Sequence, residues 1–237
     1  MHYGIPVFEF FIIGGLLVAL SAHASAQEDA RDESRQTFQL AANPRVEVMN
    51  VNGSVVIQTS DSDLVEVEIV RHAQRQKDLK YHQVSVEQTA GSLIIQGQED
   101  RAAYRRGIHV QQQVKLKIPR QVSLLVKGIG GPVQIDELEG PVKIEQVSGD
   151  LRATVRRMDQ RGIQISNIGG RVDMRFSEVF NAELTAKSIG GGININLPNV
   201  ETSDQDAAVS MSARIGTGGS PISILKVAGT VQLALGL

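Results

Sequence analysis

The densest group of side chains that could do chemistry lies between residues 136 and 161. Its members are Asp136, Glu137, Glu139, Glu145, Asp150, Arg152, Arg156, Arg157 and Arg161. Carboxylates that converge on one face, with basic residues beside them, are what polysaccharide-cleaving enzymes use. Opposite charges on neighbouring strands also form ordinary ion pairs on a solvated face. We favour ion pairs and keep a β-helical polysaccharide-active enzyme, using the 136–161 face, as the alternative.

Motifs for other catalytic chemistry are missing. The chain has no cysteine, which excludes disulfides, thiolate zinc sites and cysteine nucleophiles. His72, His82 and His109 follow the first 26 residues, and none forms an H-x-x-x-H pair. The glycines at 128–131 precede a strand pattern, whereas a dinucleotide fingerprint opens a helix. We therefore expect no enzyme activity, no cofactor and no metal site.

A second group of functional candidates is basic. Arg101, Arg105 and Arg106 flank Tyr104, and further Lys and Arg side chains occupy the polar stretch 71–82. Such a patch could bind an anionic envelope polymer or lipid headgroups, with a solvated hairpin as the alternative. Over the whole chain, 24 Lys and Arg face 26 Asp and Glu, for a formal charge of −2. This balance argues against nucleic acid as a partner and against a broad polybasic membrane surface.

The elements that must position these residues are strands. Apolar and polar residues alternate from Val46-x-Val48, through a turn at Asn52-Gly53, to Val55-x-Ile57 and beyond. Pro119 ends one such run because it cannot donate to a ladder. No convincing 3.6-residue period occurs. The fold class is therefore all-β, with longer strands and hairpins over residues 38–127.

An internal repeat follows over residues 128–237. Its openings are Ile129-Gly130-Gly131, Val147-Ser148-Gly149, Ile168-Gly169-Gly170, Ile189-Gly190-Gly191 and Ile215-Gly216-Thr217. Coils of about 20 residues that stack align short apolar triplets into ladders, which predicts a β-solenoid-like stack. An antiparallel sandwich is the alternative. The predicted turn glycines, which would supply positive φ, are Gly53, Gly130, Gly131, Gly149, Gly169, Gly170, Gly190 and Gly191.

The N-terminus has the features of an export signal. The apolar run 10–20 precedes Ala24-x-Ala26, the small-residue pattern that signal peptidase reads. We predict a signal peptide over residues 1–26, cleaved between Ala26 and Gln27, then a flexible charged leader over 27–37. The mature chain would reach the periplasm, the cell surface or the medium. An uncleaved anchor is the alternative, and it would be the chain's only contact with a membrane.

Several motifs carry a resemblance to a family. NVNGSVVI, LKIPRQVSLLVKGIGGPVQI and the recurrent (I/V)-x-G-x-V-x-I triplets resemble the bacterial β-strand-repeat family labelled "putative adhesin", and are similar to head domains of autotransporter adhesins. The resemblance covers about residues 43–237. It implies an exported, non-enzymatic binding or scaffold module of the cell envelope, with a protein or polysaccharide partner. An envelope-stress or regulatory accessory protein is a further alternative.

The last residues carry one more prediction. Residues 229–237 are mostly apolar and contain no charged side chain. A solenoid that ended there would expose unpaired backbone and the ends of its ladders. We therefore expect self-association through residues 229–237.

Overall fold

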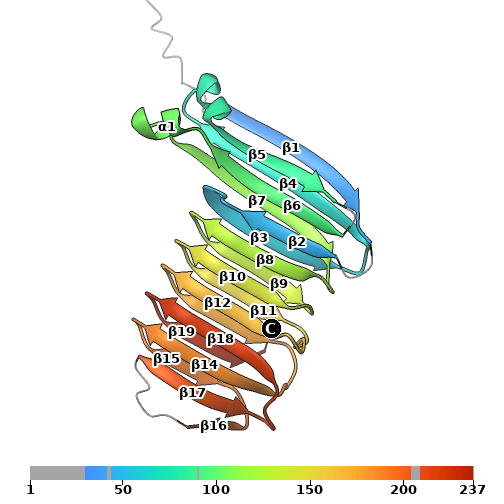
Figure 1. The fold of residues 1–237 in the computed structure, drawn as a ribbon, viewed down its shortest axis with the longest axis vertical. Coiled ribbons are helices and arrows are strands. Elements are labelled where there is room, and N and C mark those ends of the chain that lie inside the picture. The colour runs from blue at the N-terminus through green and yellow to red at the C-terminus, as the bar shows by residue number, and fades with distance from the viewer. Residues whose placement is uncertain (1–29, 42–43, 90, 204–208, 237) are drawn as a thin grey trace, which may run out of the picture.

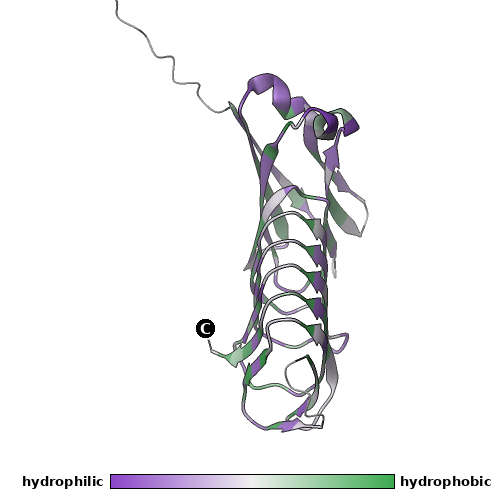
Figure 2. Cartoon of the chain, turned by 90° about the vertical axis from the view of Figure 1, so that its left-hand side faces the viewer, coloured by the Kyte–Doolittle hydropathy of each residue, from purple (hydrophilic) through white to green (hydrophobic). Residues whose placement is uncertain are grey.

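The fold is a stack of strands in two facing sheets. The computed structural model describes residues 30–41, 44–89, 91–203 and 209–236, and in these ranges nearly every element is a strand (Figure 1). Figure 2 shows the two sheets edge-on, joined by short connections on either side. No helix in these ranges is both long and apolar enough to cross a membrane. The predicted all-β, solenoid-like fold class is confirmed.

Sheet A has nine strands. From edge to edge they are β1 (Ala30–Gln39), β4 (Leu64–Ala73), β7 (Val110–Pro119), β3 (Gly53–Ser60), β9 (Val133–Leu138), β11 (Leu151–Val155), β13 (Val172–Phe176), β19 (Val231–Leu235) and β15 (Ile193–Asn196).

Sheet B has ten strands. They are β16 (Val200–Thr202), β17 (Ser210–Ile215), β14 (Ala182–Ile189), β18 (Ser220–Val227), β12 (Ile163–Ile168), β10 (Val142–Val147), β8 (Ser123–Ile129), β2 (Arg45–Met49), β6 (Ser92–Glu99) and β5 (His82–Gln88). A 3₁₀ helix η1 (Gln76–Tyr81) and a short helix α1 (Arg101–Arg105) lie at one end of the stack.

Each coil of the stack is one strand of sheet B followed by one strand of sheet A. The coils β8–β9, β10–β11 and β12–β13 follow one another in space as in sequence, and their strands are parallel. Val126, Ile144, Ile165 and Ile224 stand in register across four strands, and each is at most 1% exposed. Such ladders form the core, because a strand with alternating apolar residues directs them all to one face.

The first and last coils do not lie at the ends of the stack. β2–β3 lies between β6–β7 and β8–β9, and β18–β19 lies between β12–β13 and β14–β15. The self-association prediction therefore began from a wrong premise. Within residues 229–237, β19 pairs with β13 on one side and with β15 on the other, so it offers no free edge.

This insertion of the first and last coils between others, which we call interleaving, also corrects the predicted repeat. The fifth opening is Val227-Ala228-Gly229, because Val227 stands in register with Ile168 and Ile189. Ile215, the predicted fifth opening, instead ends β17, which runs antiparallel to β14. The predicted turn at Asn52-Gly53 does not close a hairpin, since β2 and β3 belong to different sheets.

The predicted segment boundaries also change. Part of the predicted flexible leader, 27–37, is strand β1, which pairs with β4 over ten residues. Its charges are held by partners across the sheet, such as Glu68 for Arg35 and Arg71 for Asp32. The boundary expected between residues 127 and 128 falls inside β8, and both sheets continue across it. The signal peptide and its cleavage site between Ala26 and Gln27 lie outside the described residues.

The glycines predicted as turn residues do lie at corners, but of the eight only Gly53 has a positive φ (158°), which is close to extended backbone. Left-handed φ angles instead occur just before the last aliphatic residue of several strands, as at Asn167 (φ 57°) before Ile168 and Ser188 (φ 60°) before Ile189. The glycines instead allow neighbouring coils to approach closely. A Cβ on Gly149 would lie 2.6 Å from the carbonyl carbon of Gly131, and one on Gly190 would lie 2.5 Å from the Ala228 carbonyl oxygen.

Candidate functional site

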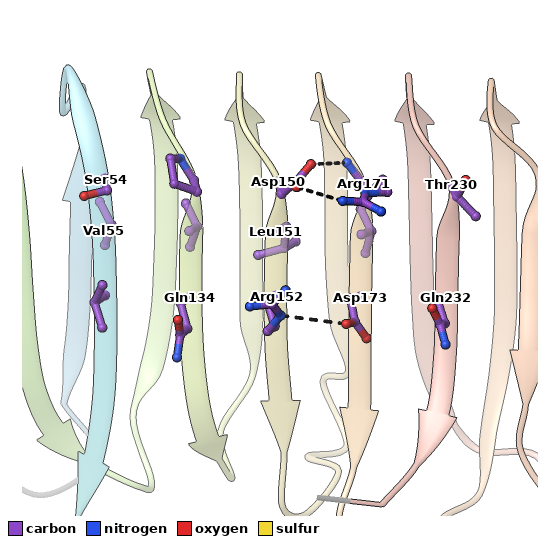
Figure 3. Close-up of a pocket in the computed structure, with 14 residues that line it drawn as sticks. Ser54, Val55, Gln134, Asp150, Leu151, Arg152, Arg171, Asp173, Thr230 and Gln232 are labelled. Carbon is purple, nitrogen blue, oxygen red and sulfur yellow. Dashed lines mark hydrogen bonds and ion pairs between the residues drawn. The ribbon is translucent and has the colours of Figure 1, made fainter.

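A shallow groove crosses the outer face of sheet A near the beginnings of five strands. It has a volume of about 390 Å³ and runs over β3, β9, β11, β13 and β19 (Figure 3). Its polar lining residues are Ser54, Gln134, Asp150, Arg152, Arg171, Asp173, Thr230 and Gln232. We call this feature the polar groove.

The repeat itself places these side chains. In each V-x-I-type triplet the aliphatic residues point into the core, so the middle residue points outward. Arg152 is in register with Gln134 on one side and with Asp173 on the other, and Asp173 is in register with Gln232. These four residues form one row, with about 4.8 Å between neighbouring strands.

The centre of the polar groove holds two ion pairs between β11 and β13. In one the arginine is on β11, and in the other the arginine is on the β13 side. β13 carries Asp173 opposite Arg152 on β11, whose Nε lies 3.8 Å from Asp173 Oδ2. At the beginnings of the same two strands the order is reversed, since Asp150 faces Arg171, with 3.7 Å between Oδ2 and Nη2. The Arg171 backbone N–H also donates to Asp150 Oδ1 at 2.8 Å. The four charges sum to zero and alternate in sign around the groove.

Asp173 is the carboxylate with the most unused hydrogen-bonding capacity there. Its two oxygens lie 3.8 Å from Arg152 Nε and 3.7 Å from Arg175 Nε, beyond hydrogen-bond length. Its Oδ1 is buried and has no hydrogen-bond partner among the described residues, while the side chain as a whole is 26% exposed. Asp173 therefore lies between two guanidinium groups without a hydrogen bond to either, and a ligand would have to displace one of them to reach Oδ1.

The charged cluster predicted at 136–161 does not converge. Glu137 pairs with Arg120, and Glu139 lies 3.6 Å from Arg156. Glu145 pairs with Lys143 at 2.9 Å on sheet B, the opposite face of the molecule. The members are thus distributed over both sheets.

One carboxylate of this cluster, and one that lies beside it, have a lowered pKa. A hydrogen bond from Lys143 lowers the pKa of Glu145, and one from Arg120 lowers the pKa of Asp61 beside Glu137. Among the described residues, no three His, Asp or Glu side chains gather as a metal site.

The basic patch predicted at Arg101, Arg105 and Arg106 lies elsewhere. α1 and the residue after it place these arginines at the end of the stack beyond β6 and β7. The structure therefore separates the two candidate sites. The sequence analysis identified Asp150 and Arg152 but missed Asp173, Arg171, Gln134 and Gln232. Their shared outward position in successive triplets was the available signal.

Two facing sheets built from parallel two-strand coils define a solenoid-like β-repeat protein. Residues 123–234 are similar to the family described as "Toastrack DUF4097", a match that runs from the start of β8 into β19. This finding and the fold confirm the resemblance to adhesin-like β-repeat proteins. No curated protein matches the chain.

A solved structure shares the fold at low sequence identity. A "putative cell adhesion protein" from Clostridium sporogenes superposes with a TM-score of 0.55 at 7% identity, covering 87% of this chain and all (100%) of that one. "Putative adhesins" from Bacteroides fragilis and Parabacteroides merdae give TM-scores of 0.30 and 0.28, at 11% and 14% identity. Each of these two matches covers 85% of this chain, and 97% and 95% of the other chain respectively.

Proposed function

We propose that the protein is an exported, non-enzymatic binding module of the cell envelope, and that its polar groove binds an extended polysaccharide. The observation that carries this proposal is the row of outward side chains on consecutive strands, with Arg152 and Asp173 at its centre.

The chemistry of the groove suits a neutral, hydroxyl-rich polymer. Two carboxylates and two guanidinium groups give no net charge, so the groove has no electrostatic preference for a polyanion or a polycation. Gln134 and Gln232 extend the row with amides, each of which both donates and accepts hydrogen bonds. Sugar hydroxyl groups do the same, so they can pair with every member of the row.

The scaffold favours repetitive recognition. The side chains project from paired strands, so their spacing is fixed before a ligand arrives. The groove lining contains no aromatic side chain on which a sugar ring could stack. Affinity would therefore come from hydrogen bonds summed over several units of one polymer, as in multivalent binding.

A polysaccharide array followed by calorimetry tests this proposal. The probe is a panel of purified bacterial envelope polysaccharides, and the groove variant is Arg152→Gln with Asp173→Asn. Lys143→Gln with Glu145→Gln is the matched control, because it removes an ion pair from the outer face of the opposite sheet. We expect the groove variant to bind at least about 10-fold more weakly, the equivalent of losing roughly 1.4 kcal/mol, and the control to bind normally. If the unsubstituted protein binds no polysaccharide, or if both variants lose affinity equally, the proposal fails.

Export is tested separately. Fractionation of cells that express the full chain, with mass spectrometry of the N-terminus, should find a chain that begins at Gln27 outside the cytoplasm. An intact Met1 in the membrane fraction would instead identify residues 10–20 as an anchor.

A further inference from the structure

Both helices of the described structure lie together at one end of the stack (Figures 1 and 2). The Asp100 backbone N–H donates to the Tyr81 carbonyl at 2.8 Å, which joins the segment that begins α1 to the end of η1. Arg106 Nη1 donates to the Tyr81 hydroxyl at 2.8 Å. Leu79 and Ala103 are buried beneath the surface. We call residues 75–81 and 99–106 the basic cap.

The charge of the basic cap differs from that of the whole chain. It contains six Lys and Arg against three Asp and Glu, whereas the chain has a formal charge of −2. One of the three acids already has a charged partner, since Arg75 Nε pairs with Asp78 at 2.7 Å, while Glu99 lies 3.8 Å from His82 Nε2, beyond hydrogen-bond length. The Asp100 side chain accepts a hydrogen bond from the Ala102 backbone N–H.

Unpaired cations are concentrated in the basic cap. In the described structure sixteen Lys and Arg form an ion pair within 4.0 Å, and eight do not. Five of the eight, all exposed, belong to the basic cap: Lys77, Lys80, Arg101, Arg105 and Arg106. The other three, Arg157, Lys187 and Lys226, lie in other parts of the stack.

The chain also enters the described structure at this end. Ala30, the first residue of β1, pairs with Ala73 and packs against a small apolar cluster that contains Leu79 of the basic cap. The apolar run 10–20 precedes it in the sequence. Residues 21–29 can span at most about 30 Å when fully extended. A bilayer that received the apolar run would therefore lie within reach of the basic cap.

We propose that the basic cap is a membrane-facing surface that docks on anionic lipid headgroups. Exposed Lys and Arg near a bilayer are each attracted to its negative surface, and their contributions add. Until residues 1–26 are removed, the basic cap and the apolar run form a two-signal arrangement for membrane attachment, and afterwards the basic cap alone attracts the anionic surface. The polar groove crosses the sheet below this end, so a docked molecule would direct its long axis and the groove away from the bilayer. The inference does not depend on what the groove binds.

Vesicle flotation tests the inference. The chain from Gln27 to Leu237 retains every described strand and helix and lacks the apolar run. Its partitioning is measured onto vesicles of phosphatidylcholine alone and onto vesicles that also contain phosphatidylglycerol. We expect binding only when phosphatidylglycerol is present, and a loss of binding in 0.5 M salt, which screens charges beyond a few ångströms.

Two triple variants remove the same charge from different places. Lys77→Gln, Arg101→Gln and Arg105→Gln should lower partitioning roughly 100-fold, given the usual contribution of each basic residue. Arg157→Gln, Lys187→Gln and Lys226→Gln should leave it within about threefold. Circular dichroism checks both folds, and Lys77→Gln with Lys80→Gln replaces the first variant if that one unfolds.

Three results would overturn the inference. One is equal binding to uncharged and anionic vesicles, and another is an equal loss in both triple variants. The third is capture of soluble polyphosphate by the basic cap without any binding to vesicles, which would assign the surface to a phosphate polymer in place of a membrane.

Discussion

At the corners of the stack, polar residues with left-handed φ turn the chain, and glycines allow neighbouring coils to approach closely. Asn167 and Ser188 turn the chain through left-handed φ angles, which asparagine in particular tolerates. Gly149 and Gly170 lie where the backbone of the neighbouring coil passes, and only a residue without Cβ leaves room there. The repeated glycines therefore set the spacing between coils.

This division predicts the effect of adding one methyl group. Gly149→Ala places a Cβ 2.6 Å from the backbone of Gly131 and Pro132, so the coils must move apart. We expect the free energy of unfolding to fall by about 1–3 kcal/mol, the usual cost of overpacking. Gly91→Ala is the control, since nothing lies within 4 Å of its Cβ. Urea unfolding measures both, and equal midpoints would contradict the close-approach explanation.

For the corner glycines, the sequence predicts where they lie but not why those positions need glycine. The spacing of Gly130, Gly149 and Gly169 locates the corners correctly because the apolar triplets around them repeat. It does not reveal the distance to the next coil, which depends on chain segments far away in the sequence. The outward row of Arg152 and Asp173 was missed for the same reason, since the residues lie 21 positions apart and meet only in the folded stack.

Among the elements, β1 shows how charge can hold an edge strand in place. Its sequence, ARDESRQTFQ, has few apolar residues to bury, and its composition alone favoured a flexible leader. Glu68 of β4 stabilises it by accepting hydrogen bonds from Lys115 of β7 at 2.8 Å and Arg35 of β1 at 2.7 Å. These bonds join three neighbouring strands, a cross-strand arrangement that no local sequence pattern reveals.

The same carboxylate predicts a pH dependence. Hydrogen bonds from Lys115 and then Arg35 lower the pKa of Glu68 below its usual 4.5. A carboxyl group whose pKa is lower in the folded state adds stability above its unfolded pKa, and this contribution is lost as the pH falls through the folded pKa. Glu68→Gln should therefore lower the thermal midpoint at pH 7, and the difference from the unsubstituted protein should shrink below about pH 4.

Salt provides the control for this prediction. At 1 M ionic strength the Debye length is about 3 Å, so the difference between the two proteins at pH 7 should also decrease. A difference that stays constant from pH 3 to pH 7 would show that Glu68 contributes through packing.

For the whole molecule, the spatial order of the coils differs from their order in the sequence. The chain builds β2–β3 first and β18–β19 last, yet each of these coils lies between two others. The first and last coils are consequently covered on both sides, whereas a simple solenoid leaves its last coil covered on one side only. The repeat pattern predicted the stack because stacking is encoded in local triplets. It could not predict the interleaving, since parallel coils with the same V-x-I pattern present nearly equivalent neighbours.

Interleaving predicts that removal of β19 breaks the stack in its interior. A chain that ends at Ala228 loses Val231 and Leu233, both fully buried, and leaves β13 and β15 without the strand between them. Each lost aliphatic side chain removes about 1.5–3 kcal/mol, and the lost ladders add to this, against a typical domain stability of 5–15 kcal/mol. We expect a shortened chain that is insoluble or lacks a cooperative thermal transition by circular dichroism.

The matched control removes an edge. A chain that begins at Leu40 lacks β1, which pairs with β4 alone, so it should unfold cooperatively at a lower temperature. If the chain that ends at Ala228 melts as the full chain does and differs only in sedimentation, β19 is a terminal strand after all. The difference in stability between the two deletions compares an interior strand with an edge strand. Removal of residues 1–39 takes away more of the chain, yet it leaves every remaining strand beside its neighbours.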